Sequence, residues 1–217
     1  MKTMLAAAIK QTIHYHMKNI HTSMPGEIVD YDFTTQKASV LPTIKEKFYT
    51  GEILSMPIVT NVPVIFPRSA NASLTFPLAK GDKVLLLFSE KSLERWLSSG
   101  EEVEMGVNRR FDLSDGIVIP GLYSFADQSP SNGEDLILQY KDSKIIIKKD
   151  GTIQSESGDA RLELKSTGEI TIENSGDSLL DILSDTLREI SQITIGGTPI
   201  DNIAVFNILK TRLDSLK

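Results

Sequence analysis

Hydrophobic residues follow a helical period at the start of the chain. One apolar stripe runs through residues 1–23 and consists of Leu5, Ile9, Ile13 and Met17. This spacing predicts a helix that ends before Pro25-Gly26. An apolar stripe has to be covered, either by the helix's own domain or by a neighbouring subunit, and the sequence leaves both possibilities open.

From residue 24 to residue 124 the pattern is typical of short β-strands. The segments 28–31 and 37–41 flank the polar residues Thr34-Thr35-Gln36, which predicts a β-hairpin. A third strand is expected over residues 58–66, restricted to an edge or end position by its prolines. The continuous apolar run over residues 83–88 predicts a strand that is buried on both faces.

One short helix interrupts this strand-rich region. It is expected over residues 92–98, with Trp96 as a core anchor whose indole N–H finds a partner, and a polar loop is expected over residues 101–110. About five strands and one helix in ~100 residues are typical of a small closed barrel of the OB type.

A repeat of 17 residues follows in the next segment, residues 125–177. Residues 144–160 align with residues 161–177, and Gly151 aligns with Gly168. Each unit is expected to form a strand, a glycine turn and a second strand. Two such units cannot bury a continuous core by themselves, because roughly three repeats are needed.

The apolar positions of the repeat are expected to share one face of a β-ribbon. A ribbon with one apolar face needs partners, and three chains wound around one axis would form a spike with a dry interior. Lys148, expected on the outside, should then tolerate a change to Asp better than Ile147. The predicted trimer interface of the ribbon consists of Ile145, Ile147, Ile153, Leu162, Leu164, Ile170 and Ile172.

Residues 178–217 are expected to form two short helices. Their apolar residues have heptad spacing, which favours either a trimeric tip or helices that fold back on the ribbon. Ser178 and Asp201 are expected to cap the helices, with Gly196-Gly197 in the turn between them. The heptad positions are Leu180, Leu183, Leu187 and Ile190, then Phe206, Leu209, Leu213 and Leu216, and the predicted interface includes Leu183, Leu187, Ile190, Phe206, Leu209 and Leu213.

Composition and charge narrow the classes of function. The chain has 217 residues, no Cys and a net charge of −6, which excludes disulfides and thiolate metal sites and argues against a nucleic-acid binder. No apolar run approaches the ~20 residues that a membrane helix needs. Residues 1–23 carry three lysines and no acid, whereas residues 24–124 carry 10 basic and 13 acidic residues and residues 125–217 carry 10 and 16.

Motifs for catalysis or metal binding are not found in the sequence. His14 and His16 point to different faces of the predicted helix, so a metal site within one chain is not expected, although three copies with His21 at a three-fold axis could hold an ion. Asp112-Leu113-Ser114-Asp115-Gly116 is better explained as a turn capped by Asp side chains than as a calcium loop. No nucleophile elbow or phosphate loop is present. We therefore expect no enzyme activity and no cofactor.

Many short motifs follow one another through the strand-rich region. They include Met24-Pro25-Gly26-Glu27-Ile28, Val62-Pro63-Val64-Ile65-Phe66-Pro67, Gly81-Asp82-Lys83-Val84-Leu85, Arg110-Phe111-Asp112-Leu113 and Ile119-Pro120-Gly121-Leu122. In this order, these motifs resemble the N-terminal OB domains of the central spike proteins of contractile-tailed phage baseplates. The resemblance covers roughly residues 1–124.

The resemblance implies a virion protein that is made in the bacterial host cytoplasm and forms a homotrimer at the centre of the baseplate. It would lie under the tail tube, contact other baseplate and tail-tube proteins, and help to breach the host cell envelope. Some related spikes hold an iron ion at the tip through His-x-His motifs, but here the only such motif is His14-Tyr15-His16, at the other end. We therefore do not expect iron, and a separate protein could complete the tip.

The alternative is a binding module, in which the OB fold holds single-stranded nucleic acid or a glycan. OB grooves that bind single strands combine basic residues with exposed aromatic side chains. In this sequence acids match the basic residues and aromatic residues make up 6% of the chain. The structural role is therefore favoured over specific binding of nucleic acid.

Overall fold

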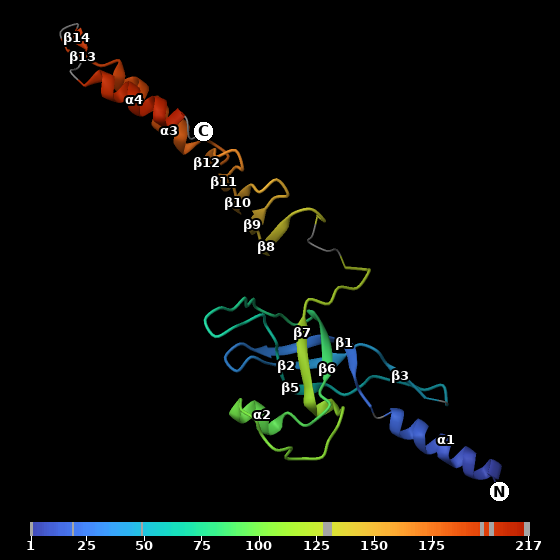
Figure 1. Ribbon diagram of the computed structural model, residues 1–217. Helices are drawn as coiled ribbons and strands as arrows, with labels where there is room; N and C mark the ends of the chain where they lie inside the picture. Colours follow the sequence, from blue (N-terminus) through green and yellow to red (C-terminus); the bar gives the residue numbers. More distant parts are fainter. Residues whose placement is uncertain are drawn as a thin grey trace. The chain divides into compact units, whose positions relative to one another are not determined.

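A computed structural model describes residues 2–18, 20–48, 50–127, 132–195, 198–199 and 202–214 (Figure 1). The fold is mainly β with an N-terminal helix, as the sequence predicts. The chain divides into two compact units, residues 1–128 and residues 129–217. Each unit is described by itself below. No helix in the described part of the chain is long and apolar enough to cross a membrane.

Five strands form the sheet of the first unit, in the order β5-β2-β1-β6-β7. Val64, just after β5, makes a parallel bridge to Val118 of β7, and the Ile65 N–H donates to the Val118 carbonyl over 2.8 Å. The two edges of the sheet therefore meet, and the sheet closes into the expected OB-type barrel. The strands are β1 (Ser23–Asp32), β2 (Lys37–Pro42), β5 (Val59–Pro63), β6 (Lys83–Phe88) and β7 (Gly116–Pro120). In the sequence, a small hairpin of β3 (Glu46–Lys47) and β4 (Ile53–Leu54) separates β2 from β5.

The apolar core of this unit lies inside the barrel. Alternate residues of the strands point inward, since successive side chains of a strand lie on opposite faces. In β6 this leaves Leu85 and Leu87 half-buried on the outer face, so the prediction of a strand buried on both faces is wrong. The core consists of Ile28, Ala38, Val40, Val59, Val62, Val64, Phe66, Val84, Leu86, Phe88 and Val118.

The predicted β1–β2 hairpin is present. Its turn is held by the Asp32 carboxylate, which accepts hydrogen bonds from the Thr34 N–H over 2.8 Å and the Thr35 hydroxyl over 2.7 Å. These bonds lower the pKa of Asp32. Gln36 completes the turn with a φ of +53°.

An ion pair with a buried carboxylate fixes the long connection between β6 and β7. Asp115 ends a turn of 3₁₀ helix (η1, Leu113–Asp115) and accepts hydrogen bonds from Arg109 over 3.0 Å and from the Leu93 N–H over 2.9 Å. Burial alone would raise the pKa of Asp115, but these hydrogen bonds hold it below its ordinary value. The Asp112 side chain accepts from the Ser114 N–H, so the expected Asp-capped turn is confirmed.

The short helix in this connection, α2 (Glu94–Ser99), has no buried residue. Trp96 is 50% exposed, and no hydrogen bond of its indole N–H is found among the described residues. Its prediction as a core anchor is therefore wrong. The physical reason is that the barrel strands fill their own interior, so that α2 lies on the outside of a core that is already complete.

The N-terminal helix α1 (Lys2–Lys18) presents its apolar stripe to solvent. All of its described side chains, residues 4–18, are exposed, including Leu5 at 64% and Met17 at 61%. The structure therefore shows no packing of this stripe on the helix's own unit.

The second unit contains an antiparallel meander of five strands followed by two helices. The strand order is β12-β11-β10-β9-β8, so each strand pairs with its neighbours in the sequence. The strands are β8 (Leu136–Tyr140), β9 (Ser143–Ile147), β10 (Ile153–Ser157), β11 (Ala160–Leu164) and β12 (Ile170–Glu173). The two predicted repeat units correspond to β9–β10 and β11–β12, and β8 is an additional strand.

The helices α3 (Leu179–Ser191) and α4 (Ile203–Asp214) pack against each other, and α3 also contacts β12. Ser178 is the predicted N-cap of α3, and its hydroxyl accepts from the Asp181 N–H over 3.5 Å. Between the helices, β13 (Thr194–Ile195) pairs with β14 (Thr198–Pro199). The predictions for Gly196, Gly197, Asp201 and Leu216 lie outside the described residues.

Candidate association surface

Two rows of apolar side chains cross one face of the meander. The rows follow from the register, which places residues of adjacent strands directly opposite each other. We call this face the apolar ladder. Its first row is Leu136, Ile147, Ile153, Leu164 and Ile170. Its second row is Leu138, Ile145, Ser155, Leu162 and Ile172. All seven ribbon residues of the predicted interface therefore lie on the same face, whereas their role as an interface stays a prediction.

The ladder is exposed in the single chain. Leu136 is 63% exposed, Leu138 is 48% exposed, and the remaining apolar members other than half-buried Ile170 are 39–45% exposed. Fully burying one such side chain contributes ~1.5–3 kcal/mol, so covering the exposed part contributes about 1 kcal/mol for each residue. Contiguous apolar surface of this kind is typical of a site of protein association.

The glycine turns keep the ladder in register. Gly151 has a φ of +87° and Gly168 a φ of +96°, a region that favours glycine. Both turns have the same hydrogen bonds: the Gly151 N–H donates to the Lys148 carbonyl, and the Gly168 N–H donates to the Lys165 carbonyl, each over 2.9 Å. The 17-residue repeat is therefore a repeat of structure. It places apolar residues on the same face in each unit.

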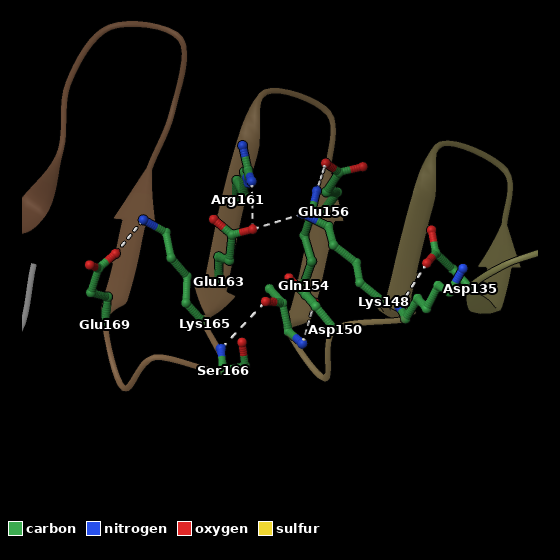
Figure 2. Close-up of polar contacts among 12 residues, drawn as sticks. Asp135, Lys148, Asp150, Gln154, Glu156, Arg161, Glu163, Lys165, Ser166 and Glu169 are labelled. Carbon is green, nitrogen blue, oxygen red and sulfur yellow. Dashed lines mark hydrogen bonds and ion pairs between the residues drawn. The ribbon is translucent and has the colours of Figure 1, made fainter.

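The opposite face of the meander carries a network of polar contacts (Figure 2), together with the half-buried pair Ile137 and Ile146. Glu163 is 5% exposed and accepts from Lys148 over 2.9 Å and from Arg161 over 2.8 Å. The hydrogen bond from Lys148 lowers the pKa of Glu163 first, burial opposes this effect, and Arg161 lowers the pKa further. Gln154, 6% exposed, lies beside this network and donates to Glu156.

A sheet in a soluble protein normally buries its apolar face and exposes its polar face, and here the burial is reversed. On the polar face Lys148 and Arg161 pair with the nearly buried Glu163, while the apolar ladder is open to solvent. A single sheet cannot cover both faces. The ladder is consequently an apolar face that the described residues of the chain leave uncovered.

The helical residues of the predicted interface are more buried than those of the ladder. Leu187, Ile190, Phe206 and Leu213 are half-buried, whereas Leu183 and Leu209 are 43% and 39% exposed. Part of the heptad pattern therefore lies in the contact between α3 and α4 of one chain. Leu183 and Leu209 remain open for contacts with other chains.

The sequence-based prediction missed two members of the ladder, Leu136 and Leu138. Leu136 lies 17 positions before Ile153, as Ile153 lies 17 positions before Ile170. The period therefore extends over one more strand. Extending the alignment upstream would have found β8.

Sites for metals and catalysis were also considered. His14 and His16 lie on the exposed helix α1, and the His21 ring packs against Phe88 with 5.7 Å between ring centroids. Within the described ranges, no group of three His, Cys, Asp or Glu side chains is placed to hold a metal ion.

Comparison with known protein families gives a match in the barrel. No curated protein matches the chain. The barrel has the strand order and the parallel closure described above, and residues 24–121 span it from β1 to β7. These residues match the family described as the Phage protein Gp138 N-terminal domain, and this match supports a structural role in a phage virion.

Proposed function

We propose that the protein is the central spike or hub protein of a contractile phage tail baseplate. Three copies would associate through the apolar ladder, under the tail tube, and help to pierce the host cell envelope. The observation that carries this proposal is the exposed ladder in a chain whose barrel matches a phage protein domain.

The ladder supports association between identical chains. Its two rows contain nine apolar residues and only Ser155 as a polar one, so any second copy offers a complementary apolar surface. With three copies, the ladders would face one axis and the Lys148–Glu163–Arg161 network would lie outside in water. The ladder itself calls for a partner, and the number three follows from the resemblance to spike proteins.

A mechanical role suits this arrangement. In an antiparallel meander every strand is hydrogen-bonded to its neighbours, and a shared apolar interior would couple the three chains. Separating the chains would then expose the apolar ladders of all three chains at once. A spike that transmits an axial push needs this kind of cooperative resistance.

The decisive experiment is the solution mass of the full-length protein, measured by light scattering at micromolar concentration. We expect three times the chain mass of 24.0 kDa. A monomer would contradict the proposal, and a stable dimer would contradict the three-fold arrangement. Gold-labelled antibodies on intact virions should bind at the baseplate end of the tail, and labelling of the capsid alone would contradict the proposed location.

A further inference from the structure

A groove of about 860 Å³ lies on the outside of the barrel, and its lining contains no residue of the apolar ladder. Its floor is the segment Pro63–Phe66, where the barrel closes. One wall is the small loop Arg68–Ser73, and the other is formed by Trp96 and Gly100 at α2. The volume is within the range of small-molecule sites, ~300–1,000 Å³.

Backbone hydrogen bonds hold the walls in place. The Ser69 N–H donates to the Ala72 carbonyl over 2.7 Å, and the Leu74 N–H donates to the Pro67 carbonyl over 2.9 Å, which closes the loop. The Gly100 N–H donates to the Trp96 carbonyl over 2.8 Å and ends α2 at the rim. The groove therefore exists before any ligand binds.

The side chains of the groove combine one aromatic plane, one cation and several neutral polar groups. Trp96 is 50% exposed, although tryptophan is normally largely buried. Arg68 has no ion pair among the described residues. The neutral polar lining residues are Gln36, Ser69, Asn71, Ser73 and Thr75.

We propose that this groove binds a saccharide that carries a negatively charged group. Trp96 offers an apolar plane for the C–H face of a sugar ring, and its N–H is a donor for a hydroxyl. The amides and hydroxyls of the lining match sugar hydroxyls. Arg68 matches a carboxylate or phosphate substituent, because guanidinium binds such groups through two parallel hydrogen bonds.

Single-stranded nucleic acid fits the groove less well. Proteins that bind single strands follow the phosphate backbone with several cations, one after another. Among the described residues that line the groove, Arg68 alone is charged. One cation suits a ligand with isolated charges better than a polyanion.

The single tryptophan of the chain makes the test direct, because all intrinsic tryptophan fluorescence comes from Trp96. The full-length protein is titrated with hexagalacturonate, glucose 6-phosphate, neutral maltohexaose and oligothymidylate. We expect a saturable change in fluorescence with at least one of the two anionic saccharides, and weaker binding of maltohexaose and oligothymidylate. No change with either anionic saccharide, or tighter binding of oligothymidylate, would overturn the proposal.

Two variants separate the groove from non-specific charge effects. Arg68→Gln should weaken binding of the anionic saccharide about tenfold, since a hydrogen bond to a charged group is lost. Lys80→Gln removes an exposed charge outside the groove and should leave binding unchanged. Equal effects of the two changes would overturn the assignment.

Access to the groove in the assembled protein is measured by acrylamide quenching of Trp96. The half-exposed indole should be quenched efficiently in the full assembly. Strong protection would mean that another chain covers the groove, and this outcome would overturn the saccharide proposal without affecting the proposed spike role.

Discussion

Two five-stranded sheets of this chain use the same alternation of apolar residues and bury them differently. In the first unit the edges meet at Val64 and Val118, and core residues such as Ile28 and Leu86 have an exposure of 0%. In the second unit the sheet stays open and its apolar residues are largely exposed. Alternation therefore predicts which residues share a face, whereas closure of the sheet decides whether the chain can cover that face alone.

The largest expected effect is on assembly. Ile147→Asp would place a charge in the ladder, and an unpaired buried charge costs several kcal/mol. Because Ile147 is 42% exposed in the single chain, the variant should fold but fail to associate. Light scattering measures the mass, and an unchanged trimer would contradict the assignment of the ladder.

The matched control for this change is Gln139→Asp on the polar face of β8, next to Lys144. It should associate normally. Lys148→Asp, expected from the sequence to be mild, is not a suitable control, because Lys148 pairs with the nearly buried Glu163. It would bring two carboxylates together.

The same substitution should have different effects in the two sheets. Leu86→Ala in the barrel core should lower the free energy of unfolding of the first unit by about 2–5 kcal/mol, because it leaves a cavity. Leu164→Ala in the ladder should instead weaken association. Denaturation followed by Trp96 fluorescence measures the loss of folding stability, and the solution mass measures the loss of association. Both are measured at two protein concentrations, because only association depends on concentration. If the stability of Leu86→Ala depended on protein concentration and that of Leu164→Ala did not, our assignment of the barrel core and the ladder would be contradicted.

A smaller effect is expected at the loop between β6 and β7. Asp115→Asn removes the charge that accepts from Arg109 and Leu93, and should cost about 1–3 kcal/mol in the stability of the first unit. Thermal unfolding measures the loss. Asp30→Asn, at an exposed position of β1, serves as the control and should unfold like the unmodified protein.

The smallest effect is expected on the pH dependence of the melting temperature. The pKa of Glu163 is lower in the folded chain than its ordinary value of about 4.5. The ionised carboxylate therefore stabilises the fold at pH values above the unfolded pKa. This stabilisation is lost as the pH falls through the folded pKa. Melting temperatures measured from neutral to acidic pH should fall less steeply for Glu163→Gln. The exposed Asp142→Asn is the control, and identical slopes for all three proteins would contradict this role.

Much of the fold was predictable because its signals are local. The β1–β2 hairpin, the Ser178 cap and the two glycine turns each depend on residues close together in the sequence. The period of 17 also determined that Ile145, Ile153 and Leu162 would share a face, because side chains alternate along a strand and the turns are equal in length.

What covers each apolar residue depends on contacts that form only when the chain folds. Trp96 and the Val84–Phe88 strand look equally buried in the sequence, yet Trp96 is exposed, because the closed barrel fills its interior with strand residues. Likewise, Asp115 accepts from the Leu93 N–H, 22 positions earlier, and Glu163 accepts from Lys148, 15 positions earlier, and only the packed chain brings these groups together. Alternation and turns are set by neighbouring residues, whereas burial depends on the surfaces that meet after folding.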